Sequence, residues 1–504
     1  MIKNVSFAAR IVCGFFLVFF AVKLAVYHYH FIVYPFPNEY REGAMLTTTA
    51  GLVRGVNPYD LQNQPQYMND YGIFYSIVTW PFAKIFGVTM LVHRLVTAFF
   101  IFACCGVMFW IMRRRRADLV FCGLAMVSFY AVCLYPGTTT PMANPSSLGL
   151  FIFLLALFIP WARGFSYPSL LISVVLGILA YYTKPYFLLC VPMMALYLFL
   201  FVSKRRSIAF SGVFALLALL SIICVHRQWN CYFSNCFFLH SNPGHLSWRQ
   251  SVNQFNAFVG LNHKVLLYSA IVLAVQALLT PKDWFKVVCF KRPLPFILYC
   301  TIICSVVLVF WLGKHEEAFL WYYFHLLSPL LLICMAVTLS RQQPWTLIFM
   351  PWLLLSCWSI VQSDMNIKLN PADEGWRSVR DLISTHKDIL NSPLIAPLLV
   401  QQNKPVYDNG LSEYFKQGGY RDNDLVKIFS KGDPRIIMRY YYFMNEVREK
   451  IKRREFDLVL IVQDYAPLVP GELTQFYRPV GKIMLSTPAI CASFPLTVWV
   501  PNDK

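Results

Sequence analysis

Two glutamates and an arginine stand close together in the sequence Asn38-Glu39-Tyr40-Arg41-Glu42-Gly43, just after the first long apolar run of the chain. Carboxylates at the point where an apolar segment leaves a membrane are costly to desolvate, and such groups mark functional sites. A carboxylate pair can also hold a divalent cation, although two acidic residues make a thin ligand set. The alternative is that Glu39 and Glu42 are solvated residues that pair with Arg41.

The chain that must position these carboxylates is strongly apolar. Of its 504 residues, 57% are hydrophobic and only 14% are charged, and the mean hydropathy is +0.51. Apolar windows of about 20 residues, the length that crosses roughly 30 Å of hydrocarbon as a helix, recur along the sequence. These properties exclude a disordered chain, a collagen and an ordinary cytosolic enzyme, and they predict a polytopic membrane protein.

The apolar runs predict a membrane all-α bundle of about eleven transmembrane helices. The expected spans are 11–33, 88–112, 118–135, 146–162, 168–183, 186–203, 208–226, 264–281, 293–313, 319–339 and 344–361.

The distribution of basic residues predicts the orientation of the bundle. The 44 lysines and arginines exceed the 25 aspartates and glutamates, and basic clusters such as 113–116 and 204–206 fall at alternate span ends. Because cytoplasmic loops carry the excess of lysine and arginine, we expect the N-terminus in the cytoplasm and the segment 36–86 outside. The positive charge therefore marks one membrane face, and no nucleic-acid partner is expected.

Two domains are predicted: a transmembrane domain over 1–361 and an extracytoplasmic α/β domain over 362–504. In the second, helical spacing at 376–383 and 433–454 alternates with buried-type strands at 405–407 and 457–462. Alternation of this kind is typical of a small α/β domain. The sequence Asp408-Asn409-Gly410 indicates a turn, with a ligand site at the end of a strand as the alternative.

The segment 36–86 is too polar to lie in lipid and too apolar to be a free loop. Residues 44–53 predict an amphipathic helix along the membrane interface, broken by Gly55 and by a turn at 57–60. Aromatic residues follow that can anchor the segment at headgroup depth, namely Tyr67, Tyr71, Phe74, Tyr75 and Trp80.

The cysteines do not form a disulfide framework. Most of the 15 lie inside predicted spans, where they behave as small apolar residues. Cys231 and Cys236, in an outer loop, can pair if that compartment is oxidising, and their spacing leaves this open. No zinc spacing, P-loop or dinucleotide fingerprint is present, so no cofactor is expected.

The stretch EYREGAMLTTTAGLVRGVNPYDLQNQPQYMNDYGIFYSIVTWPFAKIFGVTMLVHRL resembles the first outer loop and second span of GT-C membrane glycosyltransferases, of the protein-mannosyltransferase-like and aminoarabinose-transferase-like kind. Further similarities are AYYTKPYFLL at 180–189, HEEAFLWYYFHLLSPLL at 315–331, and KPVYDN, FDLVLI and VWVP in the tail. The resemblance covers most of the chain in the family's order. It implies a membrane fold of about eleven to thirteen helices, an isoprenoid-phosphate sugar donor and an acidic catalytic residue in the first outer loop.

Position by position, the resemblance places the catalytic carboxylate on Glu42, with Glu39 as the second candidate. This base accepts the proton of an acceptor hydroxyl whose oxygen attacks the anomeric carbon. The lipid phosphate that leaves needs cations, and the candidates are Lys184, Arg41 and His315. The alternatives are that Lys184 extends to water from the interface and that His315 belongs to an exposed loop.

The expected function is inverting transfer of a sugar from a polyprenyl-phosphate donor to a hydroxyl of a glycan, lipid or protein, on the outer face of the cytoplasmic membrane. No metal is required, and the substrate pocket is expected to include Tyr59, Tyr71, Tyr186 and Tyr322. The alternatives are a polytopic transporter or lipid or glycan flippase, and a non-catalytic assembly protein with the same fold. Spans nearly free of charge and the lack of matching halves argue against a transporter.

Overall fold

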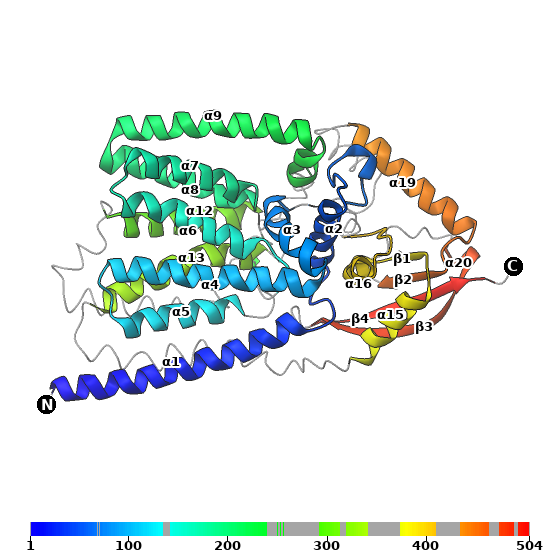
Figure 1. Ribbon diagram of the computed structural model, residues 1–504, viewed down its shortest axis with the longest axis horizontal. Coiled ribbons are helices and arrows are strands. Elements are labelled where there is room, and N and C mark those ends of the chain that lie inside the picture. Colours follow the sequence, from blue (N-terminus) through cyan, green and yellow to red (C-terminus); the bar gives the residue numbers. More distant parts are fainter. Residues whose placement is uncertain are drawn as a thin grey trace.

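The computed structural model describes residues 2–134 apart from 68 and 70, and residues 142–238, 292–312, 319–340, 373–409, 434–462, 473–487 and 492–502, with four isolated positions between 249 and 256. Within these residues the chain forms a helical bundle and a small mixed sheet. Figure 1 shows the bundle helices side by side, with the sheet at the end of the bundle opposite the N-terminus.

The bundle is built from long apolar helices. They are α1 (Ile2–Val33), α4 (Met90–Arg114), α5 (Leu119–Cys133), α6 (Ser146–Ala162), α7 (Tyr167–Tyr181), α8 (Cys190–Tyr197), α9 (Lys204–Gln228), α12 (Pro293–Leu312) and α13 (Phe319–Leu339). The short helices η2 (Pro185–Leu189) and η3 (Leu198–Val202) extend α8 at its two ends, and η4 (Ser234–Phe238) follows α9. Every predicted span within the described residues coincides with a helix. The spans predicted at 264–281 and 344–361 lie outside them.

Several of these helices have the length and composition of membrane spans. Four described helical segments are long and apolar enough to cross a bilayer, namely Arg10–Val33, Met90–Arg114, Pro185–Val202 and Lys204–Gln228. The last is only 6% buried in its most apolar window, although that window has a mean hydropathy of 2.7. An apolar surface of that extent is stable when lipid covers it. The protein is therefore a multi-pass membrane protein.

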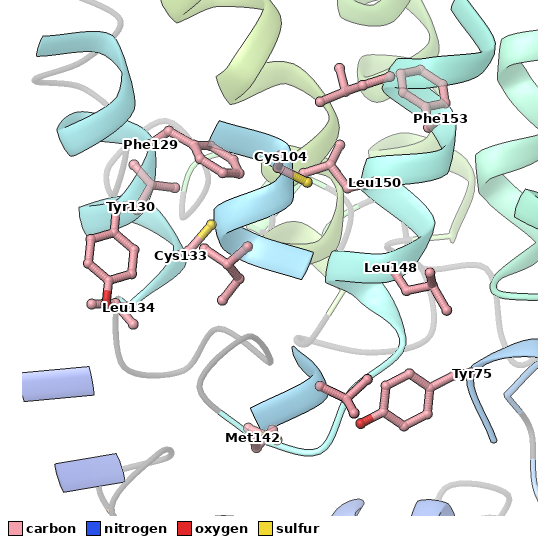
Figure 2. Close-up of a cluster of buried hydrophobic side chains, with 14 of the residues drawn as sticks. Tyr75, Cys104, Phe129, Tyr130, Cys133, Leu134, Met142, Leu148, Leu150 and Phe153 are labelled. Atoms are coloured by element: carbon pink, nitrogen blue, oxygen red, sulfur yellow. The ribbon is translucent and has the colours of Figure 1, made fainter. Parts of the chain in front are cut away.

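The core of the bundle lies where α4, α5 and α6 meet. Cys104, Phe129 and Leu150, one from each helix, are at most 2% exposed and belong to one buried cluster (Figure 2). No disulfide joins Cys231 to Cys236 in the structure. Cys231 packs with the C-terminal part of the chain, whereas Cys236 packs with the tyrosines around Tyr59.

The segment between α1 and α4 contains α2 (Glu42–Val53), η1 (Leu61–Asn63) and α3 (Phe74–Phe86). Residues 42–51 of α2 are all buried, so α2 lies inside the protein instead of along the membrane interface. Its glycines allow this packing: a Cβ on Gly43 would lie 3.0 Å from Ala396, and a Cβ on Gly51 would lie 3.0 Å from the ring of Tyr67. The predicted break at Gly55 is confirmed by its φ of 70°.

The C-terminal part combines helices with one four-stranded sheet. The elements are α15 (Glu374–Thr385), β1 (Ile389–Asn391), η7 (Pro393–Ile395), α16 (Ala396–Gln401), α19 (Pro434–Lys452), β2 (Leu458–Val462), α20 (Leu473–Phe476), β3 (Tyr477–Thr487) and β4 (Ala492–Pro501). The strand order is β1-β2-β4-β3, with β1 parallel to β2 and the other pairs antiparallel. The small α/β region predicted after the spans is confirmed.

The prediction of a strand at 405–407 is wrong. These residues form no strand, and the side chain of Asn391 binds the backbone of the segment that they begin. Its Oδ1 accepts a hydrogen bond from the N–H of Tyr407 (2.9 Å), and its Nδ2 donates to the carbonyl of Asp408 (2.7 Å). An amide that binds both backbone groups replaces the ladder that a strand partner would supply.

Candidate functional site

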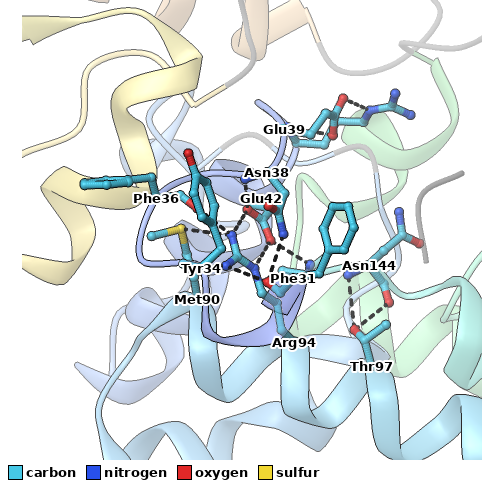
Figure 3. Close-up of polar contacts among 12 residues, drawn as sticks. Phe31, Tyr34, Phe36, Asn38, Glu39, Glu42, Met90, Arg94, Thr97 and Asn144 are labelled. Carbon is cyan, nitrogen blue, oxygen red and sulfur yellow. Dashed lines mark hydrogen bonds and ion pairs between the residues drawn. The ribbon is translucent and has the colours of Figure 1, made fainter. Parts of the chain in front are cut away.

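Glu42 is the first residue of α2 and its carboxylate is fully buried. Arg94 of α4 binds it with two parallel hydrogen bonds, from Nε to Oε1 (2.8 Å) and from Nη2 to Oε2 (2.7 Å) (Figure 3). The backbone N–H of Asn38 donates to Oε2 (2.8 Å) and that of Ala143 to Oε1 (2.9 Å). Each oxygen of Glu42 therefore accepts two hydrogen bonds.

Arg94 also fixes the end of α1. Its guanidinium donates to the carbonyls of Phe31 (3.3 Å), Tyr34 (2.5 Å) and Phe36 (2.8 Å). The last carbonyls of a helix lack intrahelical partners, and a cation is favourable there. A buried ion pair is stable only when its remaining donors and acceptors are satisfied, as they are for Arg94 and Glu42. The pair thus sets the path of the chain from α1 into α2.

Glu39 is equally buried but is bound by fewer groups. Arg41 donates to it twice, from Nε to Oε1 (2.5 Å) and from its backbone N–H to Oε2 (3.2 Å). Burial raises the pKa of Glu39 above its ordinary value, the guanidinium of Arg41 opposes this rise, and the charge of Glu42 adds to it. Among the described residues, each oxygen of Glu39 accepts one hydrogen bond, so a lone pair remains on each for a proton.

Lys184 lies in the turn between α7 and η2 and is 4% exposed. Its ammonium donates to Oγ of Ser146 (2.9 Å) and lies 4.9 Å from the ring centre of Tyr71 and 5.9 Å from that of Tyr186. Cation–π contacts of this kind stabilise an ammonium that water does not reach. Lys184 is therefore held inside the protein and does not extend to bulk water.

Close backbone packing brings Tyr71 to Lys184. The N–H of Phe74 donates to the carbonyl of Tyr182 (3.0 Å). A Cβ on Gly72 would lie 1.9 Å from that carbonyl oxygen, so only glycine permits this approach. The loop before α3 is thereby fixed against the turn that carries Lys184.

One short segment, 143–146, links the carboxylate to the lysine. Its first residue, Ala143, donates to Glu42, and its last, Ser146, accepts from Lys184. Asn144 between them bonds through its N–H to Oγ1 of Thr97 on α4 (3.4 Å). The structure therefore brings the predicted acidic residue and the predicted phosphate-binding lysine into one neighbourhood, although they are far apart in the sequence.

The other predicted site residues fall in different places. Arg41 lies beside Glu39, as expected, and its guanidinium is paired with it. Tyr71 and Tyr186 flank Lys184. Tyr59 is fully buried, and its ring packs against those of Trp229 and Tyr232.

The side chains of two further predicted site residues lie outside the described part of the structure. His315 lies outside the described residues, and Tyr322 lies within α13. Over the part of the chain that the structure describes, no group of three or more His, Cys, Asp or Glu side chains could hold a metal ion.

Sequence reasoning missed Arg94 and Ser146 as members of this site. An arginine inside an apolar span is rare and costly, so Arg94 could have been selected on that ground. Ser146 carries no such signal, because a serine at the start of a helix is common.

Two solved structures are similar to nearly the whole chain. One is the crystal structure of ArnT from Cupriavidus metallidurans bound to undecaprenyl phosphate, with 13% identity, a TM-score of 0.55, and coverage of 96% of this chain and 98% of that one. The other is ArnT from the same organism in the apo state, with 13% identity, a TM-score of 0.56, and coverage of 96% and 97%. No family model matches the chain, and no curated protein does. The likeness shows the fold, which is the GT-C fold of ArnT.

Proposed function

We propose that this protein is a membrane glycosyltransferase that transfers a sugar from a polyprenyl-phosphate donor to an acceptor hydroxyl. The observation that carries the proposal is that the segment 143–146 contacts both the buried carboxylate of Glu42 and the buried ammonium of Lys184. The GT-C fold supports it, because one structure with that fold is ArnT bound to undecaprenyl phosphate.

The proposed reaction is a direct displacement. The acceptor oxygen forms a bond to the anomeric carbon while the bond from that carbon to the phosphate oxygen breaks, which inverts the anomeric centre. The acceptor proton passes to a carboxylate, and the polyprenyl phosphate leaves with the electron pair of the broken bond. The protein supplies a base and cations that stabilise the charge on the phosphate.

We assign the base to Glu39, whereas the sequence resemblance favoured Glu42. All four acceptor positions of the Glu42 carboxylate are occupied by Arg94 and two backbone N–H groups, so no lone pair is left for the acceptor hydroxyl. Glu39 retains unoccupied lone pairs among the described contacts, and burial raises its pKa towards the operating range of a general base. In this assignment Glu42 and Arg94 hold the loop that carries Glu39.

Lys184 is the proposed partner of the donor phosphate. A phosphate is a far stronger partner for the ammonium of Lys184 than the neutral hydroxyl of Ser146. The burial of Lys184 strengthens that attraction, because little water screens the charge.

The proposed location of the reaction is the outer face of the cytoplasmic membrane. The sheet and α2 lie at the same end of the bundle, in contact through α16 (Figure 1). The basic cluster 113–116 begins in the last turn of α4, at the end of the helix away from Arg94 and Glu42, and such clusters favour the cytoplasm. On this basis we propose that residues 1–361 form a transmembrane domain and residues 362–504 form an extracytoplasmic domain.

Purified protein in liposomes, incubated with polyprenyl-phosphate sugars and candidate acceptors, tests the proposal. Polyprenyl phosphate should be released only when donor and acceptor are both present, and Lys184→Met should reduce the release. Movement of intact donor across the vesicle membrane without release would favour a flippase. Donor binding without turnover for every donor and acceptor tested would favour a non-catalytic assembly protein.

A further inference from the structure

A cavity of about 290 Å³ lies between α2, the loop that follows η1 and the chain that leaves α16. Most of its lining is polar: Thr47, Arg54, Gln66, Tyr67, Asn403 and Lys404. The apolar remainder of the wall is formed by Ala50, Val400, Pro405 and Val406. A concave hollow that combines polar groups with apolar surface is suited to a small molecule that carries both kinds of group.

The charge around this cavity is positive. Arg54 and Lys404 both line it, and no aspartate or glutamate does. Arg54 donates to Oδ1 of Asn403 (3.2 Å) and Lys404 donates to the carbonyl of His386, so both cations bind neutral acceptors. Neither forms an ion pair within the described part of the chain. Two cations around one cavity repel each other, and an anion between them removes that cost.

Tyr67 contributes an aromatic ring to the lining of the cavity. Its ring packs against Gly51, where a Cβ would lie 3.0 Å from the ring, and this contact fixes its orientation. The amides of Gln66 and Asn403 stand in the same lining. An aromatic face packs against the C–H face of a sugar ring, and planar amides both donate to and accept from its hydroxyls.

The cavity is separate from the site around Lys184. Thr47 lines the cavity, whereas Thr48, rotated by roughly 100° around α2, faces another direction. Oγ1 of Thr48 accepts a hydrogen bond from Asn69 (2.8 Å), and Asn69 in turn accepts from the N–H of Tyr71, whose ring contacts Lys184. The two sites therefore lie against different faces of one helix.

We propose that this cavity binds a sugar that carries an anionic group, either a uronate or a sugar phosphate. Arg54 and Lys404 bind the anionic group, and Tyr67 packs against the ring. This site goes beyond the proposed transferase function, because binding here requires neither a donor nor a transfer reaction.

Calorimetric titration of the full-length protein in detergent tests the site with glucuronate, glucose 6-phosphate, glucose and inorganic phosphate as probes. We expect at least one of the two anionic sugars to bind, and to bind at least tenfold more tightly than glucose or inorganic phosphate. Which of them binds distinguishes a carboxylate from a phosphate ligand. Removing both charges in Arg54→Gln/Lys404→Gln should weaken that binding by tenfold or more, since each charge-assisted hydrogen bond is worth about tenfold or more.

The matched control is Lys387→Gln, which removes an exposed lysine from the same part of the chain but outside the cavity lining and should leave binding unchanged. Tyr67→Leu keeps both cations, so it should weaken binding of the sugar while leaving any binding of inorganic phosphate intact. The proposal is overturned if neither anionic sugar binds, if glucose or inorganic phosphate binds equally well, or if a folded double variant binds as the wild type does.

Discussion

The rings of Phe36 and Trp376 are stacked, with centroids 5.8 Å apart and planes inclined by 12°. Phe36 belongs to the loop that Arg94 holds, and Trp376 belongs to α15 in the C-terminal part. Both side chains are at most 1% exposed. The C-terminal part is therefore packed against the loop that carries Glu39, although more than 300 residues separate the two rings in the chain.

We expect Trp376→Ala to destabilise the protein by about 3–5 kcal/mol, the usual cost of truncating a buried tryptophan. The substitution removes the stack on Phe36 and the hydrogen bond from Nε1 to the carbonyl of Ser486 (2.7 Å). Trp376→Phe should cost much less, because it keeps a stacked ring. Thermal unfolding in detergent measures both variants, and an unchanged midpoint for Trp376→Ala would contradict the packing described.

Removing one partner of the Glu42–Arg94 pair should cost about 3–5 kcal/mol, because the other charge stays buried without compensation. We expect Glu42→Gln and Arg94→Met each to lower the unfolding midpoint strongly and the double variant to recover part of the loss. The exposed pair of Lys452 with Glu449 (3.0 Å) is the matched control. Its removal should cost at most about 1 kcal/mol. If the loss of stability in the double variant equalled the sum of the losses in the two single variants, Glu42 and Arg94 would not interact.

Lys184→Met should weaken binding of polyprenyl phosphate by about 10- to 100-fold, because it removes a charge-assisted contact while keeping most of the apolar volume. Lys184→Arg should restore part of the affinity, a rescue that a purely packing role would not give. Lys204→Met, at the start of α9, serves as a control with a similar change of side chain. Equal affinity in wild type and Lys184→Met would remove Lys184 from the donor site.

The pH dependence of kcat/KM should show a loss of activity on acidification. A base works only when ionised, and burial raises the pKa of Glu39 above the ordinary value of about 4.3. The charge of Arg41 lowers that pKa, so Arg41→Gln should move the acidic limb of the profile to higher pH. A shift to lower pH would be incompatible with Glu39 as the titrating group.

Much of the fold could be predicted from the sequence, because apolar length alone marks a membrane helix. The helix α4 lies within two residues of the span predicted at 88–112, and α13 has the predicted bounds. The burial of α2 could not be predicted in this way. Its surroundings are supplied by α16, more than 340 residues later, and by the ring of Tyr67.

Several residues of the candidate site were predicted from the sequence, but the hydrogen bonds between them were not. The types and topology of Glu39, Glu42 and Lys184 indicated acid–base chemistry and phosphate binding on one face. The roles that we assign to Glu39 and Glu42 depend on the hydrogen bonds that Arg94 and the N–H of Ala143 donate to Glu42. A hydrogen bond from a backbone N–H has no signature in the sequence. The strand predicted at 405–407 failed for a similar reason, since the side chain that binds this segment comes from Asn391.

The most direct test of the account is the single-turnover rate of polyprenyl phosphate release by Glu39→Gln, measured with a saturating donor and an acceptor that supports wild-type activity. Glutamine keeps the size of the side chain but cannot act as the base, so we expect a rate lower by about 100- to 10,000-fold. Donor affinity and the unfolding midpoint should stay close to wild type. A near-normal rate in Glu39→Gln, together with loss of activity in a folded Glu42→Gln, would contradict the assignment and place the base at Glu42.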